Sequence, residues 1–510
     1  MRRIVVTAAL TALTIAPLAA SAASAAKGAP SGTPASAAAR PSTHRATWYA
    51  VGAAKRSITP RSLKHLYLGG YGIGPVHLAK SVLRPIYARA LAVRDPAGQQ
   101  VVITTLDVQG HFLAYQNGPY GFANMAATLH RQLHIPVANL LFTSTHTHNG
   151  PDDLGIWGGV PKSYLHRVTV QAEKAVRAAV RRERPARLRW TTVNMKGFNE
   201  TFAAKGDNDD GDLKDFPVDH TMRVLQAVDH QHRVIATMLN FASHATVYGP
   251  LDEVSPDWPG AAATYLEHDE RGMPRHRHYG YPHSTALVVE ADLGHTWPGG
   301  IPHDNIVRLN PPRKHDNNYP ADAYGNAIAR RAINAIRRGH HSVFGRVAGA
   351  RTAITVANDN PVLLAGLANP VGGIQAYRAD TPPYGAADAL TTTVAALRIG
   401  RLLLAGAPGE EYPTINIALR TGLKGAIVFP VGLADDQLGY LGTPADYVAA
   451  QECSLTDEGF FTISPLFGNQ VLAGQRRDAR ALGFHVSAGK LPTEGGKVPV
   501  NGVCLSQQLP

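Results

Sequence analysis

The stretch LFTSTHTHNGPDD, residues 141–153, decides how the fold is interpreted, because a short apolar run leads directly into two histidines. The run is typical of a buried strand, and the Asn-Gly pair that follows is a turn signal. If the strand continues through Thr147, His146 and His148 point to the same side, since side chains alternate along a strand. Two imidazoles at a strand end can hold a metal ion beside a reacting carbonyl. A surface loop can also carry such a pair by chance, so other parts of the chain have to separate the two interpretations.

Further segments alternate between strand and helix patterns. Strands are predicted where short β-branched or apolar segments are bounded by turn residues, at residues 99–108, 138–146, 186–195, 232–244, 285–294 and 425–433. Helices are predicted where apolar residues recur at helical spacing, at residues 163–182, 321–338 and 413–422. Residues 392–410 predict two strands around a tight turn. This alternation predicts an α/β or mixed α+β domain, with a large mixed β-sheet core flanked by helices.

Four polar clusters each follow a predicted strand, and the sites of open α/β sheets are built from such loops. One cluster contains the two histidines above, and the others contain His244, Glu410 and Tyr440. Glu410 leaves an apolar strand through a Pro-Gly turn. A carboxylate in such a place should be paired with a cation or bound to a metal ion. The structural alternative for His244 is a core histidine whose hydrogen bonds are satisfied. The alternative for Glu410 is an exposed acid on a loop. If the clusters converge, they form a metal site at the strand ends that uses no cysteine.

The beginning of this 510-residue chain has the pattern of a secretory signal peptide. In residues 1–26, two arginines precede an apolar run and a small-residue cleavage region, and a weak membrane anchor is the alternative. Residues 27–46 are rich in Ala, Ser and Pro and predict a disordered tether. We therefore expect a secreted, extracellular protein. Cys453 and Cys504 are consistent with one disulfide in an oxidising compartment, although the sequence alone does not pair them.

The formal net charge is +12 at pH 7, and the basic residues are spread along the chain. Nucleic acid is not expected as a partner, because no recognition motif is present and export would separate the two. Peripheral contact with an anionic membrane or envelope surface is favoured instead, with a general basic bias as the alternative. The oligomeric state is left open by the sequence.

Taken in order, the polar clusters resemble the motifs of the neutral/alkaline ceramidases. TSTHTHNGPD resembles the family's THTHSGP motif, and NFASHATVYGPLDEVSPDWPG resembles its second histidine region. APGEEY resembles its Pro-Gly-Glu segment, and GLADDQLGYLGTPADY resembles its tyrosine region. The resemblance runs from about residue 51 to residue 447. It implies a zinc amidase that splits ceramide into sphingosine and fatty acid, with one catalytic domain over residues 47–510 and without the family's C-terminal immunoglobulin-like domain.

The resemblance also implies the ligands of one zinc ion per chain, which are His146, His244, Glu410 and Tyr440. His148, the second histidine of the motif, would lie near the reacting carbonyl as the catalytic residue. Zinc would lower the pKa of its bound water towards about 7 and polarise the amide carbonyl. His148 would stabilise the oxyanion or pass a proton to the leaving amine.

Three positions depart from the family pattern. Glu200 stands where the family has a pocket arginine, Gly294 replaces a serine, and the residues after Tyr447 do not reproduce a second pocket tyrosine. The expected function is that of a secreted zinc-dependent amidohydrolase that cleaves the N-acyl amide bond of a ceramide-like lipid. The alternatives are a zinc hydrolase of another acyl amide or ester, and a non-catalytic exported binding protein that contains a metal.

Other residues have two interpretations each. Asp257 is a candidate for orienting a ligand histidine or for starting a helix, and the second is favoured. Trp157 and Trp297 would suit a groove for an acyl chain or simple packing. The insertion around His276 to His283 is interpreted as an exposed loop, with a separate metal site as the alternative.

Overall fold

The computed structural model describes residues 48–72, 74–116, 118–201, 217–268, 281, 283–299, 320–358, 389–444, 446 and 461–487. The predicted signal peptide and tether, both cysteines, Tyr447 and most of the histidine-rich insertion lie outside these residues. None of the helices in the described part of the chain combines the length and the apolar character needed to cross a membrane.

The larger sheet has nine strands in the spatial order β11-β9-β8-β6-β1-β3-β4-β5, with β13 paired to β6. The pairs β4/β5 and β9/β11 are parallel and the others are antiparallel, so the sheet is mixed as predicted. The strands are β1 (Tyr49–Ser57), β3 (Tyr87–Arg94), β4 (Gln100–Leu106), β5 (Leu140–Ser144), β6 (Arg184–Asn194), β8 (Thr221–Asp229), β9 (Val234–Phe241), β11 (Thr285–Glu290) and β13 (His341–Ser342).

A second sheet has four strands in the order β14-β15-β16-β19. They are β14 (Val347–Ala357), β15 (Ala389–Ile399), β16 (Leu402–Gly406) and β19 (Ile427–Val431). The predicted tight turn joins β15 to β16 at Gly400, whose φ is 62°. A Cβ there would lie 2.2 Å from the carbonyl oxygen of Phe344, so the turn requires glycine.

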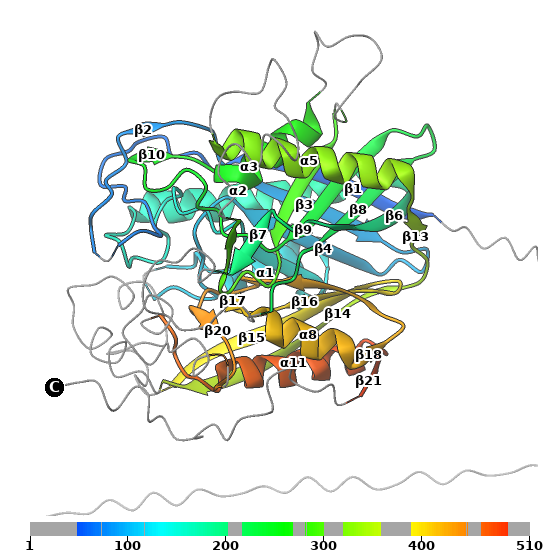
Figure 1. Ribbon diagram of the computed structural model, residues 1–510. Coiled ribbons are helices and arrows are strands. Elements are labelled where there is room, and N and C mark those ends of the chain that lie inside the picture. The colour runs from blue at the N-terminus through cyan, green and yellow to red at the C-terminus, as the bar shows by residue number, and fades with distance from the viewer. Residues whose placement is uncertain are drawn as a thin grey trace, which may run out of the picture. The chain divides into compact units, whose positions relative to one another are not determined.

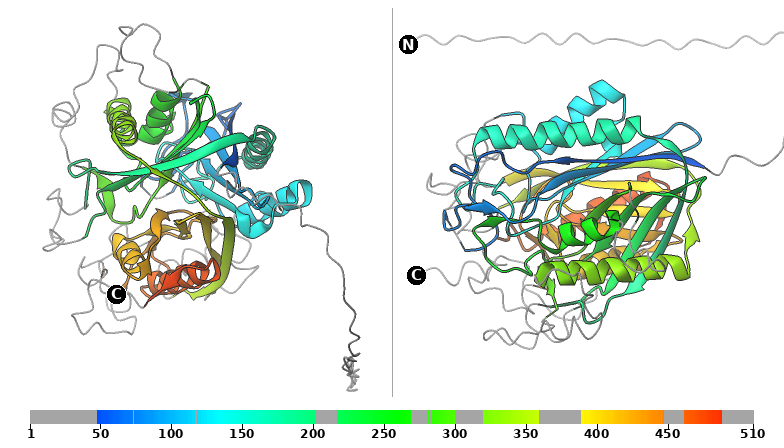
Figure 2. Two further views of the ribbon diagram at one scale, coloured as in Figure 1. Left: turned by 90° about the vertical axis from the view of Figure 1, so that its right-hand side faces the viewer. Right: turned by 90° about the horizontal axis from the view of Figure 1, so that it is seen from above.

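The two sheets pack face to face, and six helices of the described residues cover their outer faces (Figures 1 and 2). On β3, Leu91 and Val93 belong to the core between the sheets, whereas Ala90 and Ala92 pack under helices, as strand alternation requires. The larger sheet is covered by α1 (Phe122–Leu133), α2 (Lys162–Arg181), α3 (Asp257–Glu267) and α5 (Pro320–Arg338), and the second sheet by α8 (Pro413–Thr421) and α11 (Phe467–Ala481).

The larger sheet bends strongly. Five strands separate β4 from β11 in the sheet order, yet the Thr105 hydroxyl of β4 donates to the carbonyl oxygen of Val288 in β11 at 3.1 Å. The concave side holds the apolar core shared with the second sheet. The bend therefore brings strands from opposite ends of the sheet close together.

Four two-stranded pairs complete the described fold. They are β2 (Ser81–Val82) with β10 (Glu253–Val254), β7 (Asn199–Thr201) with β12 (Thr296–Pro298), β17 (Glu410–Glu411) with β20 (Tyr440–Leu441), and β18 (Leu423–Lys424) with β21 (His485–Val486). A short 3₁₀ helix, η1 (Val137–Asn139), leads into β5.

The core between the sheets should carry much of the stability. Phe429 of β19 is fully buried there, whereas Phe344 is 60% exposed. We expect Phe429→Ala to lower the free energy of unfolding by about 3–5 kcal/mol, through lost burial and the cavity that remains. Phe344→Ala removes the same atoms at the surface and should change it by less than about 0.5 kcal/mol. Denaturant unfolding of both variants checks this, and equal losses would contradict the two-sheet core.

Candidate metal centre

Two loops meet just past the ends of β5 and β9. Thr147 and Ala245 form a parallel β-bridge, and the backbone N–H of His148 donates to the carbonyl oxygen of Ala245 at 3.2 Å. The bridge joins residues just past two strand ends that lie far apart in the sheet order. It brings the two predicted histidine clusters together.

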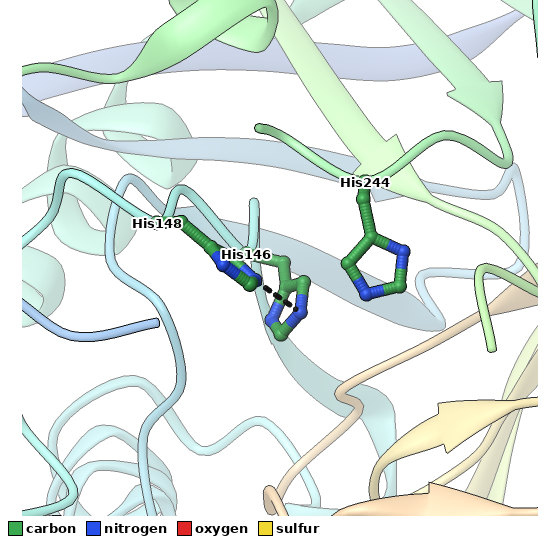
Figure 3. A group of neighbouring side chains, drawn as sticks. All are labelled: His146, His148 and His244. Atoms are coloured by element: carbon green, nitrogen blue, oxygen red, sulfur yellow. Dashed lines mark hydrogen bonds between the residues drawn. The ribbon is translucent and has the colours of Figure 1, made fainter. Parts of the chain in front are cut away.

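Three buried histidines lie at this junction, and Figure 3 shows their rings close to one another. One nitrogen from each of His146, His148 and His244 lies within 4.8 Å of the others. The Nε2 atoms of His146 and His148 are 3.0 Å apart. All three side chains are buried, and together they can hold a metal ion.

Hydrogen bonds to backbone carbonyls orient two of the imidazoles. His146 Nδ1 lies 2.9 Å from the carbonyl oxygen of Gln109, and His244 Nδ1 lies 2.8 Å from that of Thr296. Because a carbonyl oxygen only accepts, we assign the proton to Nδ1 in both rings, which leaves each Nε2 as an acceptor when the ring is neutral. Such contacts fix the tautomer and direction of a ligating histidine.

Glu410 completes a set of acceptors that face one another. Its Oε2 lies 3.0 Å from His244 Nε2 and 3.5 Å from His146 Nε2. Acceptors this close need a proton or a metal ion between them, because their lone pairs repel. Two imidazole nitrogens and a carboxylate oxygen are ligands that zinc takes. The residues therefore fit a divalent metal ion.

Tyr440 and Gln437 reach the site from the chain that follows β19. Tyr440 pairs with Glu410 in the parallel β17/β20 bridge and lines the same pocket. Gln437 Nε2 donates to Glu410 Oε1 at 2.9 Å. The carboxylate thus has one oxygen directed to the histidines and the other held by an amide.

The ionisation of Glu410 follows from its neighbours. Burial alone would raise the pKa of this carboxyl, but His146 and His244, when protonated, outweigh burial and hold the pKa well below its usual range. For His148, burial lowers the pKa well below its usual range, and the other two histidines lower it further.

The backbone at the centre is tightly constrained. His146 has a φ of 56°, in the left-handed region that non-glycine residues seldom adopt, and such a conformation costs about 1–3 kcal/mol. At Gly70, a Cβ would lie 2.3 Å from Cγ of His148, so only glycine allows this approach. The backbone of His146 thus sets the direction of its imidazole, and Gly70 leaves room for the ring of His148.

An apolar pocket opens beside the histidines. His146, His148, Glu410 and Tyr440 form its polar end. Both predicted tryptophans line it, and Trp297 stacks on His244 with ring centroids 4.4 Å apart. The apolar walls come from Phe112, Leu154, Ile156, Trp157, Leu390, Leu438, Phe461 and Ile463.

Other residues singled out in the sequence lie outside the cluster of ligands. Asp257 is the first residue of α3, in agreement with the helix-start interpretation, and its carboxylate accepts from the backbone N–H groups of Val247 and Tyr248 in the segment after His244. Glu200 pairs with Trp297 across β7 and β12. At Gly294, a Cβ would lie 2.3 Å from the carbonyl oxygen of Glu410, so a serine would not fit there.

Comparison with solved structures supports the resemblance seen in the motifs. A ceramidase complexed with C2 superimposes with a TM-score of 0.67 at 19% identity, covering 86% of this chain and 75% of that chain. The neutral ceramidase from Pseudomonas aeruginosa gives a TM-score of 0.66 at 18% identity, covering 90% of this chain and 77% of that chain. No protein-family model and no curated protein matches the sequence. The chain therefore has the fold of the bacterial neutral ceramidase, which confirms the predicted resemblance at the level of fold.

Gln437 was not identified from the sequence, and its contact with Glu410 is testable. We expect Gln437→Leu to weaken zinc binding by about 10–100-fold, because partners that orient a ligand contribute this much to metal affinity. Calorimetric titration of zinc into the metal-free protein measures the effect.

Gln475→Leu is the matched control for this experiment. Gln475 is also a buried glutamine, and its Nε2 donates at 2.7 Å to Glu411, the residue next to Glu410. This variant should lose stability but keep its zinc affinity. An equal loss of affinity in both variants would show that Gln437 has no specific part in orienting Glu410.

Proposed function

We propose that the chain is a zinc-dependent hydrolase that cleaves the N-acyl amide bond of a ceramide-like lipid. The observation that carries this proposal is the meeting of His146, His244 and Glu410 beside an apolar pocket that His146 and Glu410 line. A cluster of acceptors suits a metal ion, and the apolar walls suit an acyl chain. The fold shared with a neutral ceramidase supports the same assignment.

In this proposal His146, His244, Glu410 and Tyr440 hold one zinc ion. When bound, zinc lowers the pKa of water towards about 7 and polarises the amide carbonyl. The Gln109 and Thr296 carbonyls keep the ligand imidazoles in the required tautomer. Trp297 limits rotation of the His244 ring by stacking on it.

We assign a different role to His148. Its Nε2 lies 3.0 Å from His146 Nε2, and the residue lines the pocket. We place it within reach of the reacting amide, where its neutral imidazole donates to the developing oxyanion, or takes a proton from the attacking water and passes it to the leaving amine. The apolar walls bind the acyl chain and exclude water from the polar end.

A second candidate is a zinc hydrolase of another acyl amide or ester. The residue that favours this candidate is Glu200. It pairs with the pocket residue Trp297 across β7 and β12. The motif resemblance implied an arginine at this position. A different charge beside the pocket would suit a different head group. Both candidates use the same metal centre.

We also propose export by the signal peptide of residues 1–26, in keeping with a lipid substrate outside the cell.

The substrate is tested by measuring fatty acid released from a labelled ceramide by the purified mature protein. We expect turnover that disappears with a chelator and returns when zinc is added. His146→Ala should be inactive, and His230→Ala, which changes an exposed histidine, should retain full activity. A protein that binds about one zinc per chain but releases no fatty acid would exclude ceramide and favour the second candidate.

The roles of the histidines are separated by measuring metal content and turnover in the same variants. His146→Ala and His244→Ala should lose both the metal and activity. His148→Ala should retain the metal while kcat falls by about 100-fold or more, the usual contribution of a general acid or base. If His148→Ala also loses the metal, His148 is a ligand and our assignment is wrong.

A further inference from the structure

A second groove on the protein is lined by basic side chains. It lies between the segment that follows β1 and the first turns of α2, and no Asp or Glu is among the described residues that line it. We call its six basic side chains the basic groove: Arg61, Lys64, His65, His166, Arg167 and Lys174. Five of the six are exposed at the surface, namely Arg61, Lys64, His65, His166 and Lys174.

Arg167 is fixed within this groove. Its Nε and Nη2 donate to the carbonyl oxygens of Thr59 and Ser57 at 2.9 and 3.1 Å. Burial lowers the pKa of its guanidinium, and the nearby charge of Arg61 lowers it further. Like charges held close together in this way favour an anion between them.

The basic groove and the pocket are lined by neighbouring stretches of the same two segments. Gly70 and Gly72 line the pocket and follow His65 in the chain by five and seven residues, so an extended chain places Gly70 within about 18 Å of His65. On the other side, Trp157 lines the pocket and Pro161 lines the groove. Gly72 is exposed, so the pocket reaches the surface there.

Two exposed apolar side chains lie on the same pair of segments. Val76 and Leu78 are 58% and 43% exposed. Leu78 forms a β-bridge with Tyr67, whose backbone N–H donates to the carbonyl oxygen of Gly159 at 3.1 Å. This segment leads into β2, on the left-hand side of Figure 1. The basic groove, the pocket mouth at Gly72 and the exposed apolar residues thus lie in one region, formed by two segments that contact each other, residues 61–80 and 157–174.

We propose that this region docks on anionic lipid bilayers, with lipid phosphates in the basic groove and Val76 and Leu78 inserted among the headgroups. Peripheral proteins bind membranes in this way, through exposed apolar area together with cations that attract anionic lipids. A soluble anion would account for the groove but would leave the apolar pair in water. Docking would place the pocket mouth on the surface that supplies an acyl lipid. Membrane binding itself does not depend on hydrolysis, so it can be tested separately from the proposed function.

The test is co-sedimentation of the mature protein with phosphatidylcholine vesicles that contain about one third phosphatidylglycerol. We expect binding to these vesicles, weaker binding in high salt and none to phosphatidylcholine alone. The double variant Arg61→Glu/Lys64→Glu should bind at least about 25-fold more weakly, since each lost cation near the surface costs about fivefold.

The matched control is Arg181→Glu/Arg182→Glu, at the C-terminal end of α2, about 20 Å along the helix axis from Arg167. It changes the net charge equally and reverses two exposed arginines, and it should weaken binding by less than about twofold because salt screens distant charges. Hydrolysis of a water-soluble short-chain substrate should be unchanged in both double variants. Equal losses of vesicle binding in the two variants, or no binding by the wild type, would overturn the proposal.

Leu78→Asp separates a bilayer from a soluble anion. It should weaken binding to the anionic vesicles and leave binding of soluble polyphosphate unchanged. If Leu78→Asp has no effect on vesicle binding and polyphosphate displaces the protein from vesicles, the groove is a site for soluble anions and the membrane proposal is wrong. Thermal unfolding of each variant should match the wild type, because all five substituted side chains are exposed.

Discussion

The bend of the larger sheet is the constraint on which the metal centre depends. A flat sheet would place the ends of β5 and β9 many strands apart, but the contact between Thr105 and Val288 shows that its two ends approach each other. The Thr147–Ala245 bridge then joins the loops that carry the histidines. The second sheet fills the concave side with apolar residues such as Phe429, which stabilises the bend.

Burial of the charged groups makes the centre costly in free energy and also specific for a cation. An ionised carboxylate deep in the protein is costly unless it is paired or bound to a metal, and Glu410 has imidazole nitrogens on one oxygen and an amide on the other. The left-handed backbone of His146 persists because the surrounding contacts determine it. The result is a rigid set of acceptors that a single cation can satisfy.

Local patterns in the sequence predicted much of the fold, including β5, β9, β11 and α2, because β-branched runs and helical periodicity are local properties. The rule that polar clusters follow strand ends selected His146, His244 and Glu410, whereas Tyr440 came from the motif resemblance. The separation of β14–β19 into a second sheet was not predicted, since strand pairing depends on distant residues. Gln437 and the stacking of Trp297 on His244 were missed for the same reason: each depends on segments far apart in the chain.

The most direct test of the account is anomalous diffraction at the zinc absorption edge, from crystals of protein purified without chelator. We expect one strong anomalous peak per chain, at bonding distance from His146 Nε2, His244 Nε2, a Glu410 carboxylate oxygen and the Tyr440 hydroxyl, and no bond to His148. Zinc–nitrogen distances should be about 2.0–2.1 Å. No peak among these side chains, or a peak bound by the three histidines without Glu410, would contradict the metal centre described above.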